Sequence, residues 1–256
     1  MSAKFGGNEK FEKQMAKVIW ENRWKNFSAF DNWIDHHFCR EGAAVFAREH
    51  CVFARHFPRW FGNMIGNCPE MDARQYMIDN MYVEEVKDPA ISTGHYESMV
   101  NFSVALGVNT RKFIENYKGA IYTRMALAYW DRASRAWPWL ESFAAVAGLE
   151  AARGPLVKKM GRTRPMNASV WGRLNLKGAK AMEHWQAADE ADMPEGGHGD
   201  MTLKILSKYA DTAEKRARVM EILAESMQVR WFHFDAIGRE AIAVSGGSGS
   251  GRKKAA

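Results

Sequence analysis

Residues 139–150 read WLESFAAVAGLE, and this stretch decides the fold. Trp139, Phe143, Val146 and Glu150 recur at steps of four, three and four residues, which places them on one face of an α-helix. Three of them are apolar, so this face packs against a core, yet the fourth carries a carboxylate. An ionised carboxylate taken out of water costs several kcal/mol unless a partner or a metal ion neutralises it. Glu150 is therefore a candidate functional residue.

A second polar residue of metal-ligand type interrupts an apolar face further along the chain. His184 lies in line with Val170, Leu174, Ala181 and Ala188 on a helix predicted over residues 170–192. Two inward polar groups on separate helices indicate a site built inside a helical bundle.

Helical periodicity continues along the chain, and no segment shows the alternation of a β-strand. We predict an all-α bundle of about seven or eight helices in one domain, residues 1–244. Residues 245–256 read SGGSGSGRKKAA, which is typical of a disordered tail or an engineered linker and tag. The principal predicted helices cover residues 46–64, 71–88, 95–107, 110–130, 136–152, 170–192, 201–209 and 211–237.

Composition and charge exclude several classes of protein. The net charge of +6 includes three charges from the last residues, which leaves +3 for the body, without a basic stripe for nucleic acid. The three cysteines, Cys39, Cys51 and Cys68, form no C-x-x-C pair, so neither a disulfide framework nor a zinc ribbon is predicted. The polar first residues and the lack of a long apolar run argue against a signal peptide and a membrane span. We expect a cytoplasmic protein.

Each candidate metal ligand also has a purely structural explanation. Glu84 and Glu85 lie on a helix with two competing apolar stripes and could both be solvated. His95 follows Gly94 at a helix start, where capping is as good an explanation as ligation. Glu150 could form a buried ion pair with Arg153 or a lysine. A single inward histidine such as His184 is more often a hydrogen-bonded core residue than a metal ligand. The remaining candidates are Asp189, Asp192, Glu195 and His198.

Residues 79–107, DNMYVEEVKDPAISTGHYESMVNFSVALG, resemble a stretch found in haem-oxygenase-like proteins, the superfamily of thiaminase II and pyrroloquinoline-quinone synthase. The similarity is greatest to the haem-oxygenase-like di-metal oxidases. In that branch a Glu is followed by a His seven to ten residues on and by a second Glu about 55 later. Here Glu85 precedes His95 by ten residues, and Glu150 follows His95 by 55. The resemblance extends from about Trp33 to Asp235.

The last motif departs from the family pattern, in which a helix carries His-x-x-x-Asp-x-x-His. After His184 the acids stand at Asp189 and Asp192, and the next histidine is His198. On a straight helix Asp192 lies about 80° from His184 and Asp189 about 140°, so a π-bulge would be needed to align Asp189. The resemblance implies the metal ligands Glu85, His95, Glu150, His184, Asp189 or Asp192, and His198, with Glu195 as an alternative acid.

The resemblance further implies two ferrous ions, with manganese as an alternative, and O2 as co-substrate. Relatives oxidise small molecules by N-oxygenation of amines or by oxidative C–C cleavage of amino or fatty acids. We therefore predict an O2-dependent oxidase of a small amine or amino acid in specialised-metabolite biosynthesis, with a homodimer expected by analogy and no nucleic-acid or membrane partner. Two alternatives remain open: a cofactor-free or hydrolytic relative, and a non-catalytic helical binding protein.

Overall fold

The computed structural model describes residues 8–164, 168–192 and 197–247, without the side chains of residue 179 and residues 188–192. Within these residues the chain forms thirteen α-helices, one 3-10 helix and no strand, which confirms the all-α fold class. In chain order they are α1 (Glu9–Arg23), α2 (Ala29–His36), α3 (Arg40–Asn67), α4 (Met71–Glu85), α5 (His95–Ala105), α6 (Arg111–Asn116), α7 (Ile121–Ala136), α8 (Trp139–Ala151), α9 (Pro155–Lys158), α10 (Ala168–Gly172), η1 (Ala179–Ala181), α11 (Glu183–Asp192), α12 (His198–Tyr209) and α13 (Ala213–Gly247).

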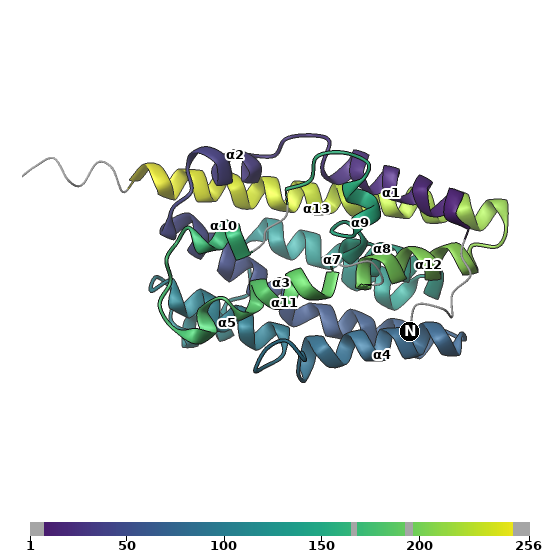
Figure 1. Ribbon diagram of the computed structural model, residues 1–256, viewed down its shortest axis with the longest axis horizontal. Coiled ribbons are helices and arrows are strands. Elements are labelled where there is room, and N and C mark those ends of the chain that lie inside the picture. Colours follow the sequence, from purple (N-terminus) through teal and green to yellow (C-terminus); the bar gives the residue numbers. More distant parts are fainter. Residues whose placement is uncertain (1–7, 165–167, 193–196, 248–256) are drawn as a thin grey trace, which may run out of the picture.

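The two longest helices, α3 and α13, organise the bundle. Helix α13 runs along one side of the molecule with α1 and α2 against it, and α4 lies on the opposite side (Figure 1). Helices α7, α8 and α12 fill the space between them, and α8 contacts α12, α13 and α7. The helix that carries Glu150 is therefore enclosed by other helices, as its apolar face predicts.

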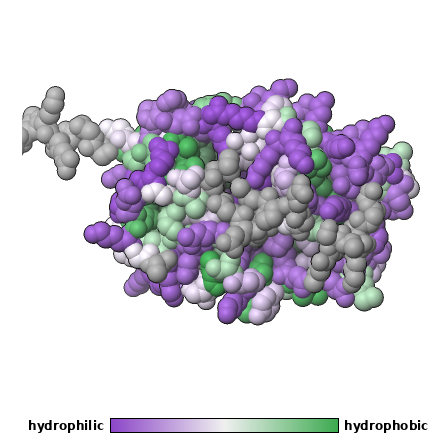
Figure 2. Space-filling view, viewed as in Figure 1, coloured by the Kyte–Doolittle hydropathy of each residue, from purple (hydrophilic) through white to green (hydrophobic). Residues whose placement is uncertain are grey.

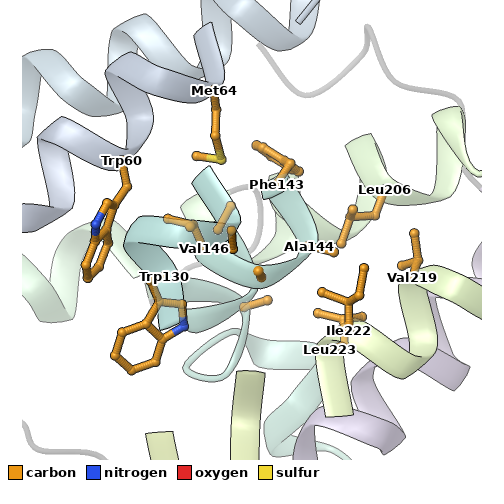
Figure 3. Close-up of a cluster of buried hydrophobic side chains, with 14 of the residues drawn as sticks. Trp60, Met64, Trp130, Phe143, Ala144, Val146, Leu206, Val219, Ile222 and Leu223 are labelled. Atoms are coloured by element: carbon orange, nitrogen blue, oxygen red, sulfur yellow. The ribbon is translucent and has the colours of Figure 1, made fainter. Parts of the chain in front are cut away.

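The core around α8 explains why this helix can be surrounded. Phe143, Ala144 and Val146 project from α8 toward large side chains of α3, α7, α12 and α13 (Figure 3). Small residues along α8 let neighbouring helices come close: a Cβ added at Gly148 would lie 2.7 Å from a methyl group of Leu223 on α13. Close-packed interiors do not absorb such a change without a shift.

Two of the predicted helices are interrupted. The predicted helix 110–130 is divided into α6 and α7 by residues 117–120, where Gly119 has a φ of +86°. The predicted helix 170–192 is divided into α10, η1 and α11, with φ values of 49° at Asn175 and 108° at Gly178. A residue in the left-handed region cannot continue an α-helix, so the prediction of one helix was wrong in both places. These breaks and the short helices raise the count above seven or eight.

The face drawn in Figure 2 is mostly hydrophilic in the described residues, with apolar residues in smaller groups between them. None of the helices within the described ranges is long and apolar enough to cross a membrane. At the chain end, α13 extends to Gly247, so the helix enters the segment predicted as a tail from residue 245.

Candidate metal centre

Glu84, Asp88 and His95 meet where α4 ends and α5 begins. Nδ1 of His95 lies 2.8 Å from Oε1 of Glu84, and Nε2 lies 2.7 Å from Oδ2 of Asp88. Gly94 permits this approach, because a Cβ there would lie 2.8 Å from the carbonyl oxygen of Glu84. The two carboxylates therefore hold one imidazole from both sides at the first residue of α5.

His95 carries a proton on each nitrogen in this arrangement. Burial by itself lowers the pKa of His95, but the charge of Glu84 and the hydrogen bond to Asp88 raise it to about 10. The pKa of Asp88 is lowered by its hydrogen bonds to His95 and Ala90, although burial opposes that shift. The imidazolium thus supplies positive charge between two buried carboxylates, which is the role that a bound cation would otherwise have.

Glu150 is held by hydrogen-bond donors from α4. The residue is only 7% exposed, and Nδ2 of the fully buried Asn80 lies 2.9 and 2.8 Å from its two carboxylate oxygens. Nδ1 of His198 lies 3.7 Å from Oε1 of Glu150, and the Tyr76 hydroxyl donates to the backbone carbonyl of His198 at 3.0 Å. The inward position expected for Glu150 is therefore observed, with Asn80 and His198 beside it.

Gly199 brings His198 to this position. A Cβ at Gly199 would lie 2.9 Å from Cα of Gly154 and 3.2 Å from the carbonyl oxygen of Glu150. The start of α12 consequently packs directly against the residues that end α8. This backbone contact explains how Glu150 and His198, which are 48 positions apart in the sequence, come close together.

His184 has the arrangement of a neutral imidazole ready to bind a metal ion. Its Nδ1 lies 3.2 Å from the carbonyl oxygen of His95 and 3.1 Å from the hydroxyl of Ser98. Nδ1 therefore carries the proton, and Nε2, which has no hydrogen bond within the described part of the chain, keeps its lone pair. Burial, reinforced by the charges of His95 and Arg153, lowers the pKa of His184 to about 3, so the ring stays neutral.

A cavity of about 360 Å³ lies beside these groups. Its wall includes Glu84, His95, Glu150 and His184, and it is completed by aromatic residues of α2, α3 and α13. The His95 and His184 rings are 6.0 Å apart between centroids, and His50 lies 5.6 Å from His184. The volume is within the range of pockets that hold small molecules.

The structure places four of the predicted ligands in two pairs, His95 with His184 and Glu150 with His198, and leaves Glu85 apart from them. Glu85 is exposed and does not line the cavity, whereas Glu84 contacts His95. The reason is that Met77 and Met81 face the core on the same stripe as Glu84, while Ile78 and Tyr82 accompany Glu85 into solvent.

The remaining predicted acids cannot be placed as ligands. Asp189 and Asp192 lie on α11, a regular α-helix without the π-bulge that would align Asp189 with His184, and their side chains are outside the described residues. Glu195 lies outside the described residues altogether.

Asp88 and Asn80 are part of the site but were missed by sequence analysis. Asp88 stands before a proline, and its side chain accepts a hydrogen bond from the Ala90 amide at 2.7 Å, as expected for a turn residue. Its position seven residues before His95 was the available signal. Asn80 carried no such signal, because a single amide on a helix is usually solvated.

The donor types of this site fit iron. Carboxylates from Glu84, Asp88 and Glu150 and imidazoles from His95, His184 and His198 form the mixed oxygen and nitrogen set that non-haem iron prefers. Among the side chains that the structure describes, no three His, Cys, Asp or Glu groups converge on one point as a metal site would require. The position of His95 explains this, because both of its nitrogens are taken up by carboxylates.

Comparison with known proteins agrees with the fold. A domain of unknown function with a haem-oxygenase-like fold from Shewanella denitrificans is 13% identical, with a TM-score of 0.67 over 97% of each chain. A TenA homolog from Pseudomonas syringae is 12% identical, with a TM-score of 0.63 over 90% of this chain and 91% of that one. A CADD-like protein of unknown function from Nostoc punctiforme is 11% identical, with a TM-score of 0.67 over 91% and 98%. None of the curated proteins compared with the sequence is similar to it.

The family is shown by the sequence itself. Residues 44–231 match the profile of a family described as iron-containing redox enzymes, which covers the site from Glu84 to His198. The three solved structures have the fold that the resemblance of residues 79–107 predicts. This chain belongs to the iron-containing redox enzyme family with the haem-oxygenase-like fold.

Proposed function

We propose that the protein is a non-haem di-iron oxidase or oxygenase that uses O2 to oxidise a small amine- or amino-acid-type substrate. N-oxygenation or oxidative C–C cleavage in specialised-metabolite biosynthesis is the expected reaction type. The observation that carries the proposal is His184: a buried, neutral imidazole with its Nε2 lone pair available, beside two carboxylate–histidine clusters on one cavity. Most buried polar side-chain atoms have a hydrogen-bond partner, whereas Nε2 of His184 has none within the described part of the chain.

The proposed ligands are Glu84, His95, Glu150, His184 and His198, with Asp88 beside His95 and Asp189 or Asp192 as the further acid. Glu84 replaces Glu85 in this set because only Glu84 reaches His95. Iron bound here supplies the electrons and the Lewis-acid template for O2 chemistry, and manganese is the alternative metal.

The residues of the chain have separate tasks in this proposal. The carbonyl oxygen of His95 fixes the His184 ring through Nδ1, so that Nε2 is presented in one orientation. His95 must release at least one of its two ring protons before it can act as a ligand, and Glu84 and Asp88 are the nearest acceptors. Asn80 holds the buried Glu150 carboxylate in position by donating to both of its oxygens. The aromatic wall excludes water from the reacting groups.

A hydrolytic function of the thiaminase II type is the second candidate, and the cysteines argue against it. Such chemistry needs an accessible, readily ionised thiol near a carboxylate. Burial raises the pKa values of Cys51 and Cys68, and none of the cavity-lining residues within the described part of the chain is a cysteine.

Iron content and O2 reactivity test the proposal together. Metal-free protein is loaded anaerobically with ferrous iron, its iron is counted, and it is mixed with O2 in a stopped-flow spectrometer. We expect about two irons per chain and a transient visible absorption band. Glu84→Gln, Glu150→Ala and His184→Ala should lose iron while staying helical by circular dichroism.

Glu85→Gln is the matched control, because it removes an identical side chain one residue away that points to solvent. The control should keep the iron content and the O2 reaction of the unaltered protein. Full iron content in all three site variants would refute the assignment of the ligands. No iron uptake by the unaltered protein would favour the cofactor-free relative or the non-catalytic binding protein.

A further inference from the structure

Two arginines line the same cavity without a carboxylate partner. Arg23 on α1 is only 5% exposed, and its Cζ lies 4.2 Å from the Trp24 ring centroid and 4.5 Å from that of Phe234. Cζ of Arg230 on α13 lies 4.5 Å from the Phe234 centroid and 3.9 Å from that of Phe53. Both guanidinium groups border the cavity and share one aromatic ring.

Within the described part of the chain, neither arginine has an ion pair. Arg23 makes no hydrogen bond there, and Arg230 makes only one, at 3.2 Å to Nδ1 of His233. The pKa of Arg230 is lowered well below its usual value by burial and by the nearby charges of Arg23 and Arg153. Burial lowers the pKa of Arg23 to about 10, and Asp31 opposes that shift only in part. Two positively charged guanidinium groups therefore lie near each other at the cavity, where a buried cation would ordinarily have a carboxylate beside it.

The other carboxylates that border the cavity are already engaged. Asp31 and Asp35 lie 3.7 and 2.5 Å from Arg164, and Asp31 also accepts hydrogen bonds from Ser28. Glu84 and Glu150 belong to the candidate metal centre. None of these four groups forms an ion pair with Arg23 or Arg230, although the charge of Asp31 acts on Arg23.

The aromatic rings do not replace a counterion. A cation–π contact contributes much less free energy than it costs to bury an unpaired charge. A site that keeps two guanidinium groups at such a cost gains most from an anionic ligand, because an arginine–carboxylate pair combines charge with two parallel hydrogen bonds.

Arg230 is also held in position, as a binding residue must be. Nδ1 of His233 accepts its hydrogen bond, and Nε2 of His233 lies 2.9 Å from the hydroxyl of the buried Thr123. Burial keeps the pKa of His233 well below its ordinary value, so this imidazole stays neutral and can accept from a cation. His233 and Thr123 are positioning residues for the guanidinium group.

We infer that Arg23 and Arg230 bind the carboxylate of the substrate, which is a small organic acid whose apolar body lies against Phe53 and Phe234. This changes the substrate class named above: plain amines are dropped, amino acids are kept, and carboxylic acids without an amino group are added. The inference rests on the proposed function only in calling the bound acid a substrate.

Binding of matched probes tests this site in the full-length protein, with and without iron. The probes are phenylpropanoate, phenylpropanamide and phenylpropylamine, and the aliphatic set hexanoate, hexanamide and hexylamine. We expect isothermal titration calorimetry to show each acid binding at least about tenfold more tightly than its amide, and the amine least tightly. The comparison uses the unaltered protein and needs no variant to fold.

Arg23→Gln and Arg230→Gln should each weaken acid binding about tenfold or more and leave amide binding unchanged. Arg59→Gln, which alters an exposed arginine on α3, is the matched control and should bind like the unaltered protein. Equal binding of acid and amide in both sets, no acid binding at all, or acid preference retained in both site variants would overturn the inference.

The outcomes separate this inference from the oxidase proposal. Acid preference without iron uptake would leave the anion site standing and refute the di-iron oxidase. Iron uptake and O2 reactivity without acid preference would leave the oxidase standing and refute the anion site.

Discussion

Asn80 is the residue on which the buried charge of Glu150 depends most directly. Its amide nitrogen serves both carboxylate oxygens, and neither residue has more than slight exposure. Asn80→Asp keeps the shape of the side chain but replaces the donor with a second negative charge. We expect the free energy of unfolding at pH 7 to fall by about 2–4 kcal/mol, because a hydrogen bond to a charged group is replaced by repulsion.

Chemical denaturation of the metal-free protein at pH 7 measures this effect. Asn116→Asp, on an exposed turn of α6, serves as control and should change stability little. A variant as stable as the unaltered protein at pH 7 would mean that Asn80 is not what stabilises Glu150.

At the scale of elements, two glycines decide how closely the histidine-bearing helices approach their neighbours. Gly94 places the start of α5 against the end of α4, and Gly199 places the start of α12 against the end of α8. In Gly199→Ala the new methyl group meets backbone atoms of Gly154 and Glu150, which cannot rotate away. We expect α12 to shift, with a loss of about 1–3 kcal/mol of stability and about a tenfold loss of iron affinity.

Denaturation midpoints and competition with a chelator check the two parts of this prediction. Gly62→Ala on α3 is the control, since a Cβ there has no neighbour within 4 Å, and alanine should stabilise the helix by about 0.5–1 kcal/mol. A Gly199→Ala protein that loses stability but binds iron normally would remove His198 from the ligand set.

At the scale of the whole molecule, the buried histidines predict a stability maximum near pH 6.5 for the metal-free protein. Burial depresses the pKa values of His50, His184 and His233 below the ordinary 6.5, so the unfolded chain binds more protons as the pH falls through 6.5. Stability is then lost on the acid side, at up to about 1.4 kcal/mol per pH unit for each group.

His95 changes the stability with pH in the opposite direction to the other three histidines. Its pKa is raised from 6.5 to about 10, so its contribution is complete below pH 6.5 and is lost as the pH rises toward 10. Urea denaturation across pH 5 to 9 should therefore give a maximum, with a shallower acid limb in His233→Asn and an unchanged alkaline limb. Stability that rises steadily from pH 5 to 9 would contradict both assignments.

Much of the fold and part of the site followed from the sequence alone. Helical periodicity depends on neighbouring residues, so the all-α class, the buried position of Glu150 and the start of α5 at His95 could be read directly. Periodicity also indicated His184, and the resemblance added His198; the His184 ring lies 6.0 Å from that of His95, and Nδ1 of His198 lies 3.7 Å from Glu150. The breaks at Gly119 and Gly178 were underestimated, because a single glycine is compatible with either a helix or a turn.

Only the tertiary structure decided which polar groups face one another. Helix α4 has apolar residues on two faces, so periodicity could not choose between Glu84 and Glu85, and only packing against α3 and α5 did so. Arg23 and Arg230 stand 207 positions apart, and nothing local to either one reports that α1 and α13 pack together. Sequence periodicity shows which face of a helix is buried, whereas the pairing of its charged groups depends on which other helix packs against that face.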